Sequence, residues 1–436
     1  MIVTLQLNSQ LNLWIARLTV VLVLSVGCWA LVRVGQAHYL IGTLNDQGAK
    51  IDPETLGQAV QRFPHSARLQ AQWAVATLTQ ANDFEESLAL AETAAQRAVQ
   101  LSPNNVDFRL LLAATQSVSG DVAARESHLR MAVTLAPHYP QVRWQLANLL
   151  VRAGKLDEAL DEFRQIADAR PALLPSAFDL LWEATSGDVS ALMRATGEQT
   201  RNRIMLANFL LQQKRADAAA QVFSSIDSTA KASAPETPDF LNRLMNAGEP
   251  ALARRLWSET RGTKDSQSGL LSNGSFETEA PTNLAHFDWQ LKRSDYASPK
   301  FEAGTAHSGE RALRLDFAGR DTTKLTDEVR QLLVLQPGMA YRLSCYAKTA
   351  QFKAPEGPRW VVLNQANNQL VAATNRVILD QADWQLLTAE FTTPAGQKTY
   401  WLALQRTPQF SYDDPTKGTL WFDDCSLGET TRTTTR

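Results

Sequence analysis

The sequence has little cysteine and histidine and almost no net charge. Its 436 residues include 3 cysteines and 6 histidines, widely scattered, which excludes a disulfide-rich scaffold and any metal motif of closely spaced ligands. A net charge of -2 gives no reason to expect a nucleic-acid partner. The sequence contains no HExxH, GxSxG, Walker or CxxC motif, so we predict that the chain is not an enzyme.

The chain is long enough for two or three domains, and its patterns divide it into successive parts. Its hydrophobic content of 44% and charged content of 20% are typical of folded proteins. In chain order we predict a membrane anchor over 1–37, helical repeats over 51–260, a linker over 261–269, a β-sandwich over 270–428 and a disordered tail over 429–436.

An uncharged apolar run near the N-terminus predicts a membrane-spanning helix. It covers Leu18–Val32 and is bracketed by Arg17 and Arg33. The run is short for a full span of about 20 residues, but snorkelling of the two arginines would extend it. We therefore predict a single-pass anchor in the inner membrane, with the bulk of the chain periplasmic or otherwise extracytoplasmic.

Two processing alternatives remain open for this segment. Leu24–Cys28 partly resembles a bacterial lipoprotein cleavage box in which Cys28 would be lipidated. Gly35-Gln36-Ala37 is a candidate signal-peptidase site, although Arg33 interrupts the approach to it.

Residues recur at a step of 34 between Asn104 and Pro171. Leu112-Ala113 returns as Leu146-Ala147, and Gly120 returns as Gly154. A fixed period in this range predicts stacked helix-turn-helix units, because each unit buries its apolar stripe only against its neighbours. The register breaks after Pro171, resumes near Arg201, and ends in a degenerate unit.

These residues resemble the tetratricopeptide repeat (TPR). The best-matching unit, Pro140 to Pro171, carries Leu146, Ala147, Gly154, Ala159 and Phe163 at the family's positions. The preceding unit departs from the pattern at Arg125, where a small residue is usual. The resemblance covers about 55–260 and implies an α-helical solenoid that binds a protein partner.

The inner face of such a solenoid is formed by the first helix of each unit. The groove candidates on that face are Trp144, Asn148, Arg152, Arg201 and Asn208. The two asparagines resemble the peptide-gripping residue of carboxylate-clamp repeats. Trp144 and Ile204 stand where the clamp lysine would be, which argues against recognition of a chain-terminal carboxylate. The alternative is a solvated face that holds no ligand.

From Leu270 onward the apolar period changes to two, which predicts strands. Turn residues separate the candidate strands, which are 270–277, 311–317, 327–335, 340–348, 359–364, 384–393, 398–406 and 418–427. Many short strands after a helical array predict a separate all-β sandwich.

The order of signals in this region resembles carbohydrate-binding modules of the galactose-binding-like jelly-roll fold. The segments that carry the resemblance are Leu271–Glu277, Trp289, His307–Leu315, Tyr341–Lys348 and Trp421–Leu427. The resemblance covers about 270–428 and implies the fold more than a particular ligand.

The same resemblance implies a structural calcium ion, with no other cofactor. Its ligands would be Asn273 and Glu277 with Asp423 or Asp424. Calcium takes six to eight oxygen ligands, which carboxylates and backbone carbonyls supply. The alternative is that the two aspartates cap a turn and that Glu277 is solvated.

A glycan site needs flat aromatic rings and a few polar hydrogen-bonding groups. Alternation along the strands selects Tyr346, Trp360 and Trp401 as rings on an open sheet face, with Arg342 and Gln405 as polar partners. The alternative is that these rings pack under loops or within the sandwich.

Cys345 and Cys425 both fall on faces predicted to point into the core. An exported domain would permit a disulfide between them, but we expect two buried thiols.

Together these parts predict a membrane-anchored scaffold of a bacterial envelope. Its helical repeats would bind a protein partner and its β-sandwich a polysaccharide, with a role in exopolysaccharide or other surface-polysaccharide assembly. One alternative is a purely structural interaction protein whose β-domain binds no sugar. A second is a glycan-active enzyme, for which no catalytic carboxylate pair is identified.

Overall fold

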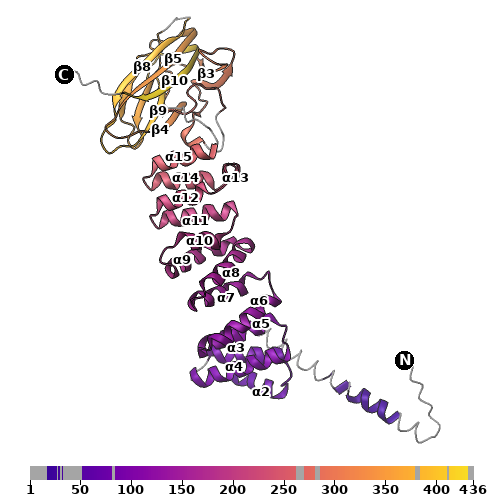
Figure 1. Cartoon of the computed structure of the whole chain (residues 1–436). Helices are drawn as coiled ribbons and strands as arrows, with labels where there is room; N and C mark the ends of the chain where they lie inside the picture. Colours follow the sequence, from indigo (N-terminus) through magenta and orange to yellow (C-terminus); the bar gives the residue numbers. More distant parts are fainter. Residues whose placement is uncertain are drawn as a thin grey trace, which may run out of the picture. The chain divides into compact units, whose positions relative to one another are not determined.

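The computed structural model describes residues 17–26, 28–29, 32, 52–80, 84–261, 270–279, 285–378, 383–409 and 412–430. The chain divides into two compact units: a helical unit, 1–173, and a mixed unit, 174–436, which holds further helices and a β-sandwich (Figure 1). The division follows Pro171, where the sequence repeat loses its register. Apart from Arg261, Glu429 and Thr430, the predicted linker and tail lie outside the described residues.

Most of the predicted membrane anchor, 1–37, also lies outside the described residues. Its described part, 17–26 with 28–29 and 32, is helical, and Cys28 is an exposed free cysteine. Among the described residues no helix is both long and apolar enough to cross a membrane, so the predicted transmembrane helix is not found there.

The described part of the helical unit consists mainly of α-helices. They are α2 (Pro53–Arg62), α3 (Ala67–Gln80), α4 (Phe84–Leu101), α5 (Val106–Ser119), α6 (Val122–Leu135), α7 (Pro140–Arg152) and α8 (Leu156–Ala169), followed by η1 (Pro171–Leu173). Local chemistry sets their ends. Asp52 and Asn105 cap α2 and α5 through their side chains, and Gly120 ends α5 at φ 83°, which favours glycine.

The 34-residue sequence step is a structural repeat. Helices α5 and α7 begin 34 residues apart, and so do α6 and α8. The recurring apolar residues are buried, Leu112 with Ala113 in one unit and Leu146 with Ala147 in the next. The region is therefore a helical repeat.

The mixed unit begins with a second run of helices. They are α9 (Leu174–Ala184), α10 (Val189–Thr196), α11 (Thr200–Gln212), α12 (Ala216–Ser224), α13 (Ser228–Ser233), α14 (Thr237–Asn246) and α15 (Pro250–Arg261). The resumed repeat is visible in α12 and α15, which begin 34 residues apart. The short helix α13 lies between α12 and α14 and has no counterpart in the earlier repeat units.

The β-sandwich consists of two five-stranded antiparallel sheets (Figure 1). The first sheet has the order β1-β4-β9-β6-β7, with bounds Gln290–Leu291, Val329–Val334, Thr399–Gln405, Arg359–Asn364 and Leu370–Ala373. The second sheet has the order β2-β3-β10-β5-β8, with bounds Ala297–Ala303, Arg311–Ala318, Lys417–Glu429, Ala340–Lys353 and Gln385–Thr392.

The predicted first strand, 270–277, is not a strand. Asn273 and Phe276 adopt positive φ, which interrupts extended backbone. Gly274 lies under the carbonyl oxygen of Cys425, where a Cβ atom would approach to 1.9 Å. The segment instead buries Leu271 and Phe276 in the sandwich core.

The sandwich core contains Cys345 and Cys425, which form a disulfide between the neighbouring strands β5 and β10. The expectation of two thiols was wrong. A register shift between Asp423 and Ser426 interrupts the β10–β5 pairing at this point. The sulfur atoms therefore meet where the regular backbone ladder is interrupted.

Candidate functional site

Trp401 is a half-buried ring on the outer face of the first sheet. It lies opposite Leu363 on β6, in a small apolar cluster with Val361 and Ala403 that is separate from the sandwich core. Because residues directly opposite in an antiparallel pair share a face, this cluster and Trp401 lie on the side of the sheet that faces away from the core.

One polar side chain lies over this ring, and two more lie on the same face further along the strands. The Arg330 guanidinium lies 4.3 Å from the ring centroid of Trp401, and Arg330 Nε donates to Gln290 Oε1 at 2.9 Å. Gln405 lies opposite Arg359 at the end of β9. An aromatic ring beside a few fixed donors and acceptors is the kind of surface that holds a sugar by stacking and hydrogen bonds.

Trp360 does not lie on this face, so its assignment to the glycan surface was wrong. It is opposite Leu404, which is in the sandwich core, and its side chain is fully buried. Its ring contacts Trp289 at 5.4 Å and Phe422 at 5.1 Å between centroids. Trp360 is therefore a packing residue.

Tyr346 belongs to β5 in the second sheet, so it does not share a surface with Trp401. Its ring is covered by His307, which stacks on it at 3.7 Å with an interplanar angle of 14°. Trp384 also contacts His307, at 5.6 Å between ring centroids. The predicted single face that carries Tyr346 and Trp401 was thus wrong. Arg342, also on β5, is exposed and lies 3.7 Å from Glu390.

The side chains of the four predicted calcium ligands form hydrogen bonds with backbone and side-chain groups of the protein. Asn273 Oδ1 accepts from the Thr278 N–H, and Glu277 Oε1 accepts from the N–H groups of Glu310 and Arg311. Among the described residues, no group of three or more His, Cys, Asp or Glu side chains is placed to hold a metal ion.

The two aspartates act on the same segment, 307–311, as Glu277. Asp423 accepts from the N–H groups of His307 and Ser308, and Asp424 contacts the His307 ring and the Ser308 hydroxyl. Burial raises the pKa of Asp423 above its ordinary value, while the N–H bonds act in the opposite direction. As arranged, these carboxylates fix a loop rather than form an ion cage.

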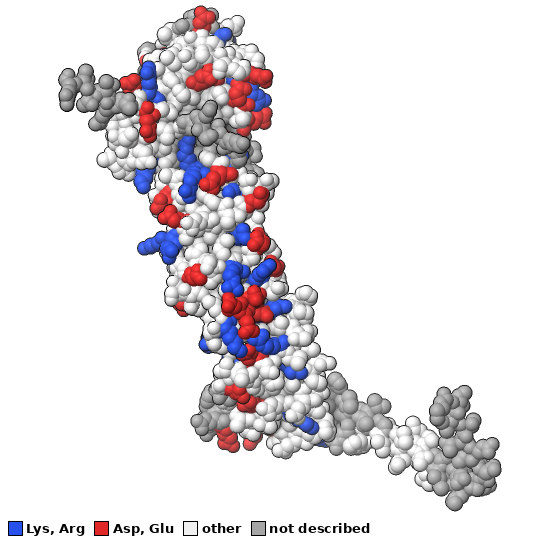
Figure 2. Space-filling model, viewed as in Figure 1, with Lys and Arg blue, Asp and Glu red and all other residues white. Residues whose placement is uncertain are grey.

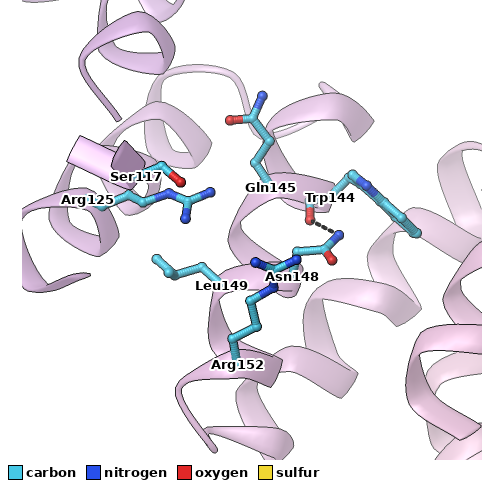
Figure 3. Close-up of a pocket in the computed structure, with 7 residues that line it drawn as sticks. All are labelled: Ser117, Arg125, Trp144, Gln145, Asn148, Leu149 and Arg152. Carbon is cyan, nitrogen blue, oxygen red and sulfur yellow. Dashed lines mark hydrogen bonds between the residues drawn. The ribbon is translucent and has the colours of Figure 1, made fainter. Parts of the chain in front are cut away.

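Three of the predicted groove residues meet in one pocket. Trp144, Asn148 and Arg152 from α7 line a cavity of about 370 Å³ in the helical unit (Figure 3). Arg201 and Asn208 lie on α11 of the mixed unit, where Arg201 Nε is 3.3 Å from Glu236. The structure therefore brings together only the α7 members of the set.

Sequence reasoning missed Arg330, Arg359 and Arg125 as site residues. The first two lie on the same face of the sheet as Trp401, and strand alternation placing them outward was the available signal. Arg125, on α6, lines the pocket beside α7, and its signal was a charged residue where the repeat favours a small one.

Comparisons with known proteins agree with the fold of the C-terminal region. A carbohydrate binding domain family matches residues 268–413. No curated protein matches the chain. Similar solved structures include one titled "CBM4 structure and function", with 19% identity, 37% of this chain and 99% of that chain covered, and a TM-score of 0.28.

Two further structures are similar to parts of the chain. The CBM22-1 xylan-binding domain from Paenibacillus barcinonensis Xyn10C has 17% identity, 36% and 91% coverage and a TM-score of 0.24. The crystal structure of MamA has 10% identity, 45% and 89% coverage and a TM-score of 0.27. These TM-scores are too low to carry an argument, so of the comparisons only the domain match supports a function.

Proposed function

We propose that the chain binds a glycan through its β-sandwich, on the outer face of the first sheet around Trp401. The observation that carries the proposal is the carbohydrate binding domain match over 268–413. The half-buried ring with Arg330 over it, and Gln405 and Arg359 on the same face of the sheet, support this face as the site. Both rings have a side chain over them, but Tyr346 is covered by a parallel aromatic ring at 3.7 Å, whereas the guanidinium over Trp401 offers hydrogen-bond donors to a sugar, which makes the second sheet the weaker candidate.

Affinity gel electrophoresis of the full chain on a panel of polysaccharides tests this proposal. We expect Trp401→Ala to weaken retention by about tenfold to a hundredfold, because truncating an anchoring ring removes on the order of 2 kcal/mol. The matched control is Trp384→Ala beside the second sheet, which should leave retention unchanged.

Two outcomes would contradict it. Absence of retention on every polysaccharide would overturn glycan binding. Loss of retention in Trp384→Ala but not in Trp401→Ala would move the site to the second sheet.

We also propose a wider scaffold role. In this proposal the helical repeats are TPR units that hold a protein partner, an N-terminal segment anchors the chain to a membrane, and the assembly serves surface-polysaccharide production. The combination of a helical repeat with a carbohydrate-binding domain supports it. Fractionation of the tagged full chain tests the anchor, since recovery of uncleaved protein in the soluble fraction would refute it.

Binding without catalysis is part of the same proposal, and a reducing-end assay on retained polysaccharides checks it. Calcium at Asn273, Glu277, Asp423 and Asp424 stays a prediction. A melting transition that is the same with and without a chelator would remove it.

A further inference from the structure

The pocket in the helical unit lies between two consecutive helix pairs. Its lining combines the α7 residues Trp144, Gln145, Asn148 and Leu149 with Ser117, and it includes two arginines, Arg125 from α6 and Arg152 from α7. Figure 3 shows the two guanidinium groups reaching into the same space from different helices. Its volume of about 370 Å³ is within the range of pockets that hold small ligands or peptide side chains.

The two arginines share this pocket without an acidic partner among the described residues. Two other basic side chains of α7 and the turn after it are paired with acids: Arg143 with Glu162 at 2.6 Å, and Lys155 with Glu126 at 2.8 Å. Figure 2 shows acidic and basic side chains mixed over this part of the chain. Burial, together with the like charge of Arg152, lowers the pKa of Arg125. The pocket therefore holds uncompensated positive charge.

The repeat itself shows that packing does not require Arg125. The equivalent positions in other units are Ala159, Ala219 and Ala253, all of them buried. Arg152 is likewise replaced by Gln212 and Asn246 in the later units. Arg152 lies in the last turn of α7, where the helix dipole favours a positive charge. Arg125 lies near the start of α6, so the same effect does not explain it. A local departure from a pattern that packs well elsewhere is typical of a functional site.

We propose that this pocket binds a carboxylate side chain of an acidic peptide segment on a protein partner. Each guanidinium presents its N–H groups in a rigid fork that matches a carboxylate, and the pair of positive charges in the pocket is complementary to it. The amides of Asn148 and Gln145 and the hydroxyl of Ser117 both donate and accept hydrogen bonds, so they match peptide groups on either side of that carboxylate.

The inference rests on the proposal that the helical repeats hold a protein partner, and it does not depend on glycan binding by the sandwich. It differs from recognition of a chain terminus. The sequence lacks the clamp lysine, and the two arginines provide a site for a carboxylate anywhere along an extended peptide.

Fluorescence anisotropy of the full chain with a labelled peptide of alternating Glu and Gly tests the proposal. The neutral probe is the same peptide with Gln in place of Glu. We expect only the acidic peptide to bind, and Arg125→Gln and Arg152→Gln each to weaken it by about tenfold to a hundredfold. Added salt should weaken binding further.

The matched control is Arg164→Gln, which removes one exposed positive charge of α8 outside the pocket. It should bind the peptide like the unaltered chain. Circular dichroism melting shows whether each variant is folded, and we expect no loss of stability, since within the described part of the chain neither pocket guanidinium forms an ion pair that the substitution would break. Equal weakening by all three variants would show a general charge effect and overturn the proposal.

The remaining outcomes distinguish failure of the carboxylate site from failure of the proposal that the helical repeats hold a protein partner. No binding of the acidic peptide overturns it. Equal binding of the Glu and Gln peptides overturns the carboxylate site but keeps peptide binding. Tighter binding of oligogalacturonate, or of inorganic phosphate, at the same arginines overturns the peptide assignment in favour of another anion. Polysaccharide retention by the same preparations should be unchanged in Arg125→Gln.

Discussion

At the scale of single residues, a buried ion pair fixes one end of the sandwich. Arg406 and Asp414 are fully buried and form an ion pair. The remaining guanidinium donors of Arg406 bond the carbonyl oxygens of Thr323 and Glu356, so one side chain joins three loops. An isolated charge in this position would have no water to replace its partner.

We therefore predict that Arg406→Met lowers the free energy of unfolding by about 3–5 kcal/mol, because it breaks the buried ion pair with Asp414 and removes the donors to the carbonyl oxygens of Thr323 and Glu356. Urea denaturation followed by tryptophan fluorescence measures the change. The control is Arg342→Met, whose exposed pairing with Glu390 at 3.7 Å should be worth less than about 1 kcal/mol. Equal losses in the two variants would contradict the prediction.

Trp401 and Trp360 show when the alternation of apolar residues along a strand predicts which face a ring lies on. For 398–406, the apolar residues Leu402 and Leu404 set the phase, and Trp401 faces outward as predicted. Around Trp360 the sequence is apolar at four consecutive positions, 360–363. Alternation therefore could not show which of these residues face the core, because the first sheet has apolar residues on both faces. Only the strand partner, Leu404, decides that Trp360 faces the core.

At the scale of elements, helices were easier to predict than edge strands. The helical repeats were predicted from their 34-residue step, and local residues fix the helix starts, with Asp52 and Asp121 accepting from backbone N–H groups of α2 and α6. Strand β2 was missed because it is an edge strand that contains Pro299 and charged residues, so it lacks a clear apolar alternation. Pairing with β3 defines it, and this is information from distant residues.

The link between β5 and β10 gives the prediction at this scale. Because Cys345 and Cys425 are bonded across a separation of 80 residues, the denatured chain under non-reducing conditions should expose Cys28 as its single reactive thiol. Reduction should lower the stability of the sandwich by about 2–4 kcal/mol, since the open chain regains entropy on unfolding.

Thiol counting with a maleimide reagent and melting with and without reductant measure these two effects. A Cys28→Ser variant, which leaves the sandwich untouched, should react with no maleimide until it is reduced. Three reactive thiols in the unreduced, denatured chain would refute the bond.

At the scale of the whole molecule, the last helices and the sandwich belong to one compact unit, although their sequence patterns differ. The contact between them uses the short segment before β1. The rings of Trp257 and Phe287 meet at 5.7 Å between centroids, and His286 Nε2 lies 3.1 Å from Asn242 Oδ1. The sequence marked the end of the helices near residue 260 and the start of the strands at Leu270, but it carried no information about this packing, which depends on side chains on both sides of the linker.

A buried charge at this contact couples the stability of the helices to that of the sandwich. Asp288 is fully buried and pairs with Arg261 at the end of α15. Arg261→Met removes the cation paired with this buried carboxylate, so we predict a loss of about 3–5 kcal/mol from the mixed unit, seen together in helical circular dichroism and in sandwich fluorescence. Arg255→Met on the same helix removes an exposed pairing with Glu259 at 3.8 Å and should change little. Replacing Asp288 by Leu in the Arg261→Met background should recover part of the loss, because the unpaired charge is then gone. A loss confined to the helical signal would show that the helices and the sandwich unfold independently.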